Sequence, residues 1–182
     1  MPFRSDIRQW TTAEALRAHL ANYDPRIASW CRGIVLHHTV RPDTTEWRGV
    51  RSMQAMQAYY TQLGWQAGPH LFLACHAPNT TTNGVWQMTA LNETGVHAAG
   101  ANSFTWGIEV VGAFDAKPWS AVQQALVYDV VVALMQWRGI TEVSKRTLMG
   151  HREVPSPKSC PGRMIDMDKV RSDIAQRLRG AS

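Results

Sequence analysis

Residues 148 to 162 read Leu-Met-Gly-His-Arg-Glu-Val-Pro-Ser-Pro-Lys-Ser-Cys-Pro-Gly, and the rest of the chain can be interpreted around this stretch. It places His151 and Cys160 nine positions apart, with Pro155 and Pro157 between them. Because proline fixes φ and has no amide hydrogen for a helix or a central strand, we expect the stretch to be a shaped loop. Such a loop can fold back and bring the imidazole and the thiol to one point.

This pairing of side chains indicates a metal site. Imidazole nitrogen and thiolate sulfur are ligands that zinc prefers. A catalytic zinc is typically held by three protein ligands, with the fourth position left to water, so a third ligand is expected from elsewhere in the chain. Lys158 lies two residues before the thiol. Taken alone, it would be read as a solvated loop lysine.

Length and composition are those of an ordinary globular protein. The chain has 182 residues, of which 45% are hydrophobic and 18% charged, which suits one domain spanning residues 1–182 with a substantial core. The net charge of +5 favours an acidic partner, such as nucleic acid, an anionic membrane or an anionic wall polymer. Because the basic residues are scattered, we expect no nucleic-acid partner.

Three cysteines, an odd number, imply no complete disulfide framework. We expect Cys31 and Cys75 to be free, buried thiols that behave as small hydrophobic residues. No apolar run approaches the roughly 18 residues of a membrane span, and residues 1 to 6 lack the apolar core of a signal peptide. We therefore expect a protein that is cytoplasmic as made. The expected oligomeric state is a monomer.

Hydrophobic periodicity predicts strands that alternate with helices. Residues 1 to 10 read as an irregular lead, and Thr11 to Glu14 has the form of a capping box before a helix. Alternation of this kind is typical of an α/β domain with a central sheet flanked by helices. The expected strands are residues 33–38, 70–75, 85–88 and 106–111, and the further expected helices run from Val50 to Gly64, from Pro118 to Trp137 and onward from Asp166.

The third ligand is sought among the histidines that end the first expected strand. His37 and His38 are adjacent there, and successive strand side chains point to opposite faces, so only one can enter a given site. Strand ends are where α/β folds place their chemistry. A lone strand histidine is more often a packed or surface residue, but the His-His-Thr ending of a buried strand favours a ligand.

Two further polar residues stand out against their surroundings. Glu109 lies inside Gly-Ile-Glu-Val-Val-Gly, and a carboxylate in such an apolar run needs a partner or a metal nearby, because burying it alone is costly. The alternative is an edge-strand residue that faces solvent. His97 lies in a small-residue loop that could let a ligand approach closely, or it is a simple turn histidine.

Several motifs in order carry a resemblance to a known family. They are Leu-His-His-Thr, Gly-Pro-His-Leu-Phe-Leu, Gly-Val-His-Ala, Asn-Ser-Phe-Thr-Trp-Gly-Ile-Glu-Val-Val-Gly and Gly-His-Arg-Glu-Val…Lys-Ser-Cys-Pro-Gly-Arg. Together they resemble the zinc N-acetylmuramoyl-L-alanine amidases, the type 2 amidases, which include phage endolysins, bacterial muropeptide amidases and peptidoglycan recognition proteins. The resemblance covers about residues 30–170. It implies a mixed sheet flanked by helices, with zinc at one edge.

The resemblance also implies roles for individual residues. Its ligand set corresponds to His37, His151 and Cys160 around Zn²⁺. Glu109 matches the glutamate that acts on the zinc-bound water, and Lys158 matches the residue that supports the developing oxyanion. One further position matches a substrate-side histidine, His97.

One departure from the family pattern concerns the second motif. Part of the family has Gly-Tyr-His-Phe where this chain has Gly68-Pro69-His70-Leu71, so the tyrosine that assists those members is absent. The chain therefore resembles the members that use a glutamate and a lysine for catalysis, or its catalysis is impaired.

The expected function is hydrolysis of the amide between N-acetylmuramic acid and L-alanine in peptidoglycan or muropeptides. We expect a phage or prophage endolysin that acts on the wall after release. Three alternatives stay open: a bacterial muropeptide-recycling amidase, a peptidoglycan-binding module without catalysis, and a zinc hydrolase of a different amide. Cys160 argues against the binding module, because members that lost catalysis typically lack the cysteine ligand.

Overall fold

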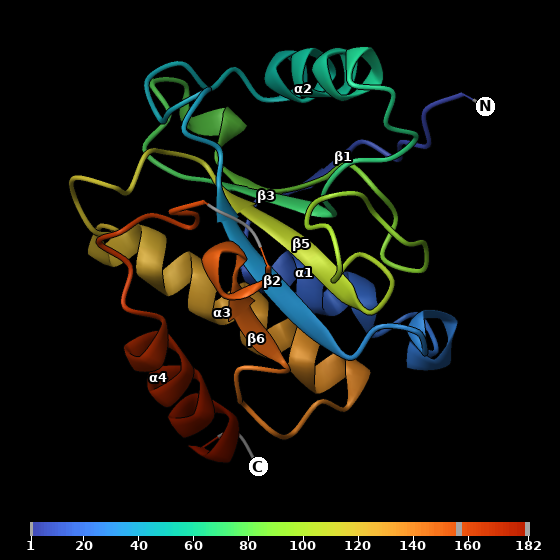
Figure 1. The fold of residues 1–182 in the computed structure, drawn as a ribbon, viewed down its shortest axis with the longest axis vertical. Helices are drawn as coiled ribbons and strands as arrows, with labels where there is room; N and C mark the ends of the chain where they lie inside the picture. The colour runs from blue at the N-terminus through green and yellow to red at the C-terminus, as the bar shows by residue number, and fades with distance from the viewer. Residues whose placement is uncertain (1, 156–157, 181–182) are drawn as a thin grey trace.

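A six-stranded mixed sheet forms the centre of the molecule (Figure 1). The computed structural model describes residues 2–155 and 158–180, so Pro157 lies outside the described residues. The strands follow the order β1-β4-β3-β5-β2-β6 across the sheet. Their bounds are β1 Arg8–Trp10, β2 Gly33–His38, β3 Leu71–Ala74, β4 Gly84–Gln87, β5 Thr105–Val110 and β6 Leu148–Gly150.

The sheet changes character along its width. Strands β3, β5, β2 and β6 run parallel to one another, whereas β1, β4 and β3 form antiparallel pairs. Parallel neighbours need crossover connections, and helices supply most of them. The predicted fold class, an α/β domain with a central mixed sheet flanked by helices, is confirmed.

In the described part of the chain, four α-helices surround the sheet, and three of them begin with a side-chain cap. In α3 (Ala121–Arg138), Ser120 and Gln123 form a reciprocal capping box, and in α4 (Met167–Gly180) the Asp166 carboxylate accepts from the first-turn amides. Helix α1 (Ala13–Leu20) is capped by Thr12, not by Thr11 as the expected capping box required. Helix α2 spans Val50–Gln62.

Two predictions of irregular structure are wrong. Residues 8 to 10 form β1, which pairs with β4 at the edge of the sheet. Leu148–Gly150, taken as the start of a loop, forms β6 and pairs in parallel with β2. Both strands are only three residues long and lie at sheet edges, so pairing with a neighbour decides their structure and local periodicity cannot reveal it.

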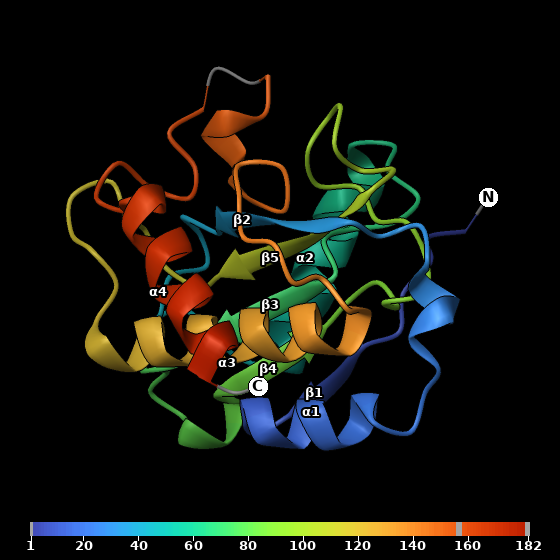
Figure 2. The same ribbon diagram turned by 90° about the horizontal axis from the view of Figure 1, so that it is seen from below.

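Side-chain alternation gives the sheet two different faces. On one face, β2, β3 and β5 contribute apolar residues to a large core under α1 and α3. On the other face, α2 covers β3 and β4 through a smaller core that includes Trp47, Met53 and Phe72. Figure 2 shows α1 and α3 on one side of the sheet and α2 on the other. The carboxyl end of β2 and β5 on the α2 side is where polar residues gather.

Among residues 2–155 and 158–180, no helix combines the length and apolar character that a membrane crossing requires.

Candidate metal centre

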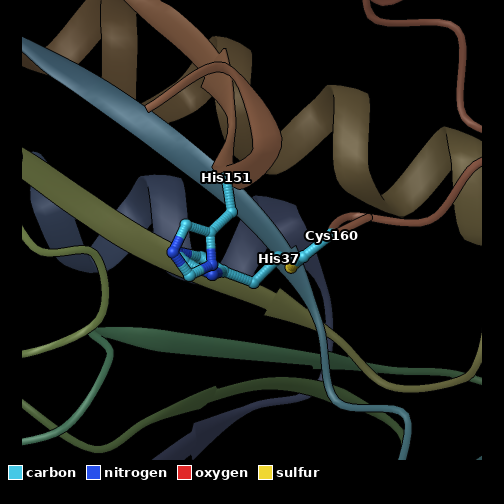
Figure 3. Close-up of side chains that lie close together, drawn as sticks. All are labelled: His37, His151 and Cys160. Atoms are coloured by element: carbon cyan, nitrogen blue, oxygen red, sulfur yellow. The ribbon is translucent and has the colours of Figure 1, made fainter. Parts of the chain in front are cut away.

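Three side chains from separate parts of the chain meet beside the carboxyl end of β2. His37 comes from β2, His151 opens the short 3₁₀ turn His151–Glu153, and Cys160 follows in the next loop. One donor atom from each lies within 4.8 Å of the others, and all three side chains are buried. Figure 3 shows the three side chains pointing toward one another.

Strand pairing explains why two of these residues meet. In the parallel β2–β6 pair, Leu36 is the partner of Gly150, so the chain places His37 and His151 side by side, one residue beyond that pair. Their rings lie 4.5 Å apart between centroids. A Cβ at Gly150 would lie 2.8 Å from Pro161 Cδ, so the small residue lets the Cys160 loop approach the strand.

Arg152 fixes the loop that carries the thiol. Its backbone N–H donates to the Cys160 carbonyl at 2.7 Å, and its guanidinium donates to the carbonyls of Ser159, Gly162 and Ile165. In addition, the His38 amide donates to Cys160 Sγ at 3.3 Å. The sulfur is therefore positioned by hydrogen bonds from the turn that contains Arg152 and from the end of β2.

A chain of ring contacts sets the tautomer of His37. Nε2 of His97 lies 3.1 Å from the Thr105 carbonyl oxygen, which can only accept, so this nitrogen carries the proton. Nδ1 of His97 then accepts from His37 Nε2, which is 3.1 Å away. Because burial lowers the pKa of His97 to about 4, the ring is neutral and this assignment is unique. His37 Nδ1 is left with a free lone pair.

Glu109 faces that lone pair from the neighbouring strand. It pairs with His37 in the β2–β5 register and with Phe72 in the β3–β5 register, so it lies on a central strand. Its Oε1 is 4.0 Å from His37 Nδ1, and its buried Oε2 has no hydrogen-bond partner among the described residues. Burial raises the pKa of Glu109 to about 8, against the opposing charge of Lys158. The alternative of a solvent-facing edge residue is therefore wrong.

The donor set suits a divalent cation of intermediate softness. Burial lowers the pKa of His37 well below the ordinary value and that of His151 to about 4, so both rings are neutral and can coordinate. Burial, with the nearby Glu109 charge, raises the pKa of Cys160, so a thiolate here needs a cation beside it. Two imidazoles, one sulfur and an orphaned carboxylate oxygen match the ligands and surroundings of zinc.

A cleft of about 520 Å³ opens above these groups. Lys158 is exposed and lines it together with Glu109 and the three donor residues. The positive charge of Lys158 contributes to lowering the pKa values of His37 and His151, so its ammonium group acts on the site electrostatically.

His38 lies on the other side of β2 from its neighbour. Its ring stacks against Phe114 at 6.1 Å, and its Nδ1 accepts from the Phe114 amide at 3.2 Å. This contact turns the ring toward Phe114 and the α3 side, as expected from strand alternation, while the residue also borders the cleft at the end of β2. His38 is not part of the three-residue group.

The segment that departs from the family pattern also borders the cleft. Pro69 is one of its lining residues, whereas His70 is fully buried behind it. His70 Nδ1 accepts from the Gly107 amide at 3.0 Å, and Nε2 lies 2.9 Å from the Glu93 carbonyl oxygen. Both ring nitrogens are thereby used in holding the fold.

The supporting residues were not identified from the sequence. Arg152 could have been suspected, because a cation lies directly after one proposed ligand and eight residues before another. Arg171 is less accessible to sequence reasoning: it reaches from α4 to make two hydrogen bonds, of 2.8 and 2.9 Å, with the Glu153 carboxylate. The Thr105 contribution is a backbone carbonyl and leaves no sequence signal.

The two remaining cysteines are buried, as predicted. Burial raises the pKa of Cys31 to about 12 and that of Cys75 to about 11, so neither is a reactive thiolate at neutral pH.

Comparison with solved structures identifies the same fold in two groups of proteins. N-acetylmuramoyl-L-alanine amidase LysC from Clostridium intestinale superposes with a TM-score of 0.63 at 22% identity, over 81% of this chain and 87% of that one. Drosophila PGRP-LB gives 0.64 at 18% identity, over 93% and 86%. Drosophila peptidoglycan recognition protein SA gives 0.62 at 22% identity, over 78% of each chain.

No protein with a curated description matches the chain in sequence. A family model does match, and it spans residues 27–163, which include every residue of the candidate centre. The model describes N-acetylmuramoyl-L-alanine amidases. This match covers most of the chain, and it agrees with the fold and with the order of the motifs. The chain therefore belongs to the Amidase_2 family of N-acetylmuramoyl-L-alanine amidases.

Proposed function

We propose that this chain is a zinc-dependent N-acetylmuramoyl-L-alanine amidase that cleaves the amide between the lactyl group of muramic acid and L-alanine. One observation carries the proposal. His37, His151 and Cys160 place three donor atoms within 4.8 Å beside a buried carboxylate that has an unpartnered oxygen. Family membership and the likeness to amidases and peptidoglycan recognition proteins support the substrate class.

The three donor residues, which line the cleft, would hold the metal. Zinc in this position supplies a Lewis acid that polarises the scissile carbonyl and acidifies water. His97 acts through His37: its Nδ1 accepts a hydrogen bond from His37 Nε2–H, and its own Nε2–H donates to the Thr105 carbonyl. The free Nδ1 lone pair of His37 therefore stays directed at the centre.

Glu109 is the proposed general base. It is the buried carboxylate next to the donor group, and its free Oε2 can take a proton from the attacking water. It then returns that proton to the nitrogen of the leaving amine, so the C–N bond breaks to give a carboxylic acid and a free amino terminus. A pKa raised by burial suits a group that must both accept and donate.

Lys158 is the proposed electrostatic group. As the amide carbonyl becomes tetrahedral, negative charge develops on its oxygen, and an ammonium group on the cleft wall stabilises that charge. Lys158 acts through its positive charge, and the acid–base work is assigned to Glu109.

We further propose a phage or prophage endolysin that acts on assembled wall. The net charge of +5 favours association with an anionic wall, and the centre lies in a cleft that a glycan-linked peptide can enter. Soluble muropeptides would be hydrolysed by the same chemistry. The difference between a lytic and a recycling role lies in how fast the enzyme cleaves cross-linked sacculi compared with soluble fragments.

One experiment tests this assignment. The purified protein is assayed for bound zinc and for release of new N-terminal alanine from purified peptidoglycan. We expect one zinc per chain and new alanine termini, both abolished in Cys160→Ser. Binding of peptidoglycan without new termini would identify a recognition module, and new termini other than alanine would identify a hydrolase of a different amide. Cleavage confined to soluble muropeptides would identify a recycling enzyme.

A further inference from the structure

Val40 is the most unusual backbone position beside the candidate centre. Its φ is +58°, in the left-handed region that favours glycine. A β-branched side chain at such a φ is a genuine outlier, because Cβ crowds the backbone there. Among the described residues, the other non-glycine residue with positive φ is His76, and histidine adopts this region more readily.

Hydrogen bonds on both sides hold Val40 in this conformation. The Arg41 amide donates to the Thr39 carbonyl at 2.6 Å, which closes a three-residue turn centred on Val40. Turns of this kind with positive φ are rare and strained. The Val40 amide donates to the Gly112 carbonyl at 2.9 Å, and Thr39 Oγ1 accepts from the Gly112 amide at 3.0 Å.

The Val40 side chain belongs to none of the hydrophobic clusters of the described residues. Val40 is 49% exposed, so the strain is not maintained to fill the core. The residue lines the cleft above His37, Glu109 and Cys160. It follows His37 by three positions, so its Cα lies within roughly 11 Å of the His37 Cα. Strain that persists beside a reacting centre points to a contact that only the ligand completes.

The composition of the cleft wall indicates which part of the ligand this is. Tyr59 of α2 and Leu63, the residue directly after that helix, are 53% and 49% exposed and line the same cleft as Val40. The charged residues of the cleft wall are Glu109, Asp115 and Lys158. The proposed substrate carries small apolar groups beside the scissile amide: the methyl of the lactyl group and the methyl of L-alanine.

We propose that Val40 is a specificity-determining residue, held in a strained turn so that its isopropyl group contacts one of the two methyl groups flanking the scissile amide. This inference rests on the proposed function. It predicts that the same substitution raises stability and weakens substrate recognition, because the strain serves the ligand and not the fold.

The test uses two substitutions at Val40. In Val40→Asn, the new residue tolerates positive φ and lacks the apolar branch; in Val40→Ala, Cβ and most of its strain remain while the branch is lost. We expect Val40→Asn to raise Tm by about 2 to 4 °C and Val40→Ala to leave Tm nearly unchanged. Both should raise KM for a muramyl peptide about 5-fold to 20-fold, with kcat less affected.

Two altered substrates identify the methyl group. One has glycine in place of L-alanine, and the other has a glycolyl ether in place of the lactyl ether. If Val40 contacts the methyl group that a substrate lacks, the parent no longer binds that substrate better than the variants do. The ratio of the variant KM to the parent KM then falls to about one on that substrate. The matched control is His76→Asn, which relaxes the other positive φ at a residue that does not line the cleft. We expect no change in KM there.

The outcomes separate this inference from the function on which it rests. A parent that turns over muramyl peptides while both Val40 variants keep the parent KM overturns the contact. A Tm for Val40→Asn at or below that of the parent overturns the claim that Val40 is strained. If the ratio of variant KM to parent KM is the same on the natural substrate and on both altered substrates, the methyl assignment is overturned. A zinc-loaded parent that neither binds nor cleaves any muramyl peptide refutes the proposed function itself, and the contact with it.

Discussion

On the face covered by α1 and α3, the strands present residues such as Leu36 and Ile108, which are fully buried in an apolar core. On the opposite face, the same two strands present His37 and Glu109, one position further along. Neighbouring residues of one strand thus serve different purposes, because alternation sends them to opposite sides. The covered face stabilises the fold, and the other face keeps the imidazole and carboxyl groups of the candidate metal centre, which no core would accept without a partner.

The face of β2 and β5 that presents His37 and Glu109 borders the cleft and is called the open face below. Several local features support the side chains on it. Gly107 follows Trp106 on β5 and lies beneath His97, where a Cβ would be 2.3 Å from the His97 Cγ atom. Arg171 is only 7% exposed, and its pairing with Glu153 ties α4 to the turn that carries His151. The residues around the candidate centre are therefore held by specific hydrogen bonds and close contacts in addition to apolar packing.

The largest effect should come from removing the histidine on the open face at the end of β2, compared with removing its neighbour on the covered face. His37→Ala removes a proposed ligand and should abolish tight zinc binding and essentially all hydrolysis. His38→Ala removes a ring on the α3 side and should keep most zinc and activity. Zinc content by atomic absorption, with turnover on a defined muropeptide, ranks the two variants. If His38→Ala proves the more damaging, the ligand assignment moves to His38.

Next in size is the loss of the carboxylate on the open face. Glu109→Gln keeps the shape and the zinc but removes the proposed base, and turnover should fall roughly 10³-fold to 10⁴-fold. Lys158→Ala should cost less, roughly 10²-fold to 10³-fold. The control is Glu142→Gln, a change outside the cleft. Near-parent turnover by zinc-loaded Glu109→Gln would place the base elsewhere, with His97 as the next candidate.

A smaller effect is expected from a change that disturbs His97, the hydrogen-bond partner of His37, and leaves the three donor residues in place. Gly107→Ala should displace His97 and leave the Nε2 proton of His37 without its acceptor, which lowers zinc affinity about 10-fold to 100-fold. Gly180→Ala is the matched control, because a Cβ there meets nothing within 4 Å. Competition with a chelator measures both. Equal zinc affinity in the two variants would show that the His97 contact does not orient the ligand.

The smallest effect on activity should come from the covered face. Ile108→Ala removes a fully buried side chain next to Glu109 and should destabilise the fold by about 2 to 5 kcal/mol. Below its lowered melting temperature, the variant should keep zinc affinity and turnover close to those of the parent. Denaturant unfolding and kinetics at low temperature measure the two separately. A large loss of turnover in the folded variant would mean that the two faces are not independent.

Much of the fold follows from the sequence, because its signals are local. The run from Gly33 to His38 is apolar and β-branched, and the strand has those bounds. Asp166 is the expected start of the last helix, and α4 begins directly after it. Helix α3 begins after its cap Ser120, three residues beyond the expected start at Pro118. In contrast, β1 and β6 are three-residue edge strands that exist through pairing with β4 and β2, and no periodicity could reveal them.

For the site, the residue types could be read from the sequence: a His-His pair at a strand end, a carboxylate in an apolar run, and a histidine and cysteine in a proline-rich stretch. That His37 and not His38 faces Glu109 became known from the folded chain, because the register between β2 and β5 pairs His37 with Glu109. The folded chain also decided which nitrogen of His37 is free, through the contacts of His97. The physical reason is that residue chemistry is local, whereas distance, burial and proton position depend on segments that meet only after folding.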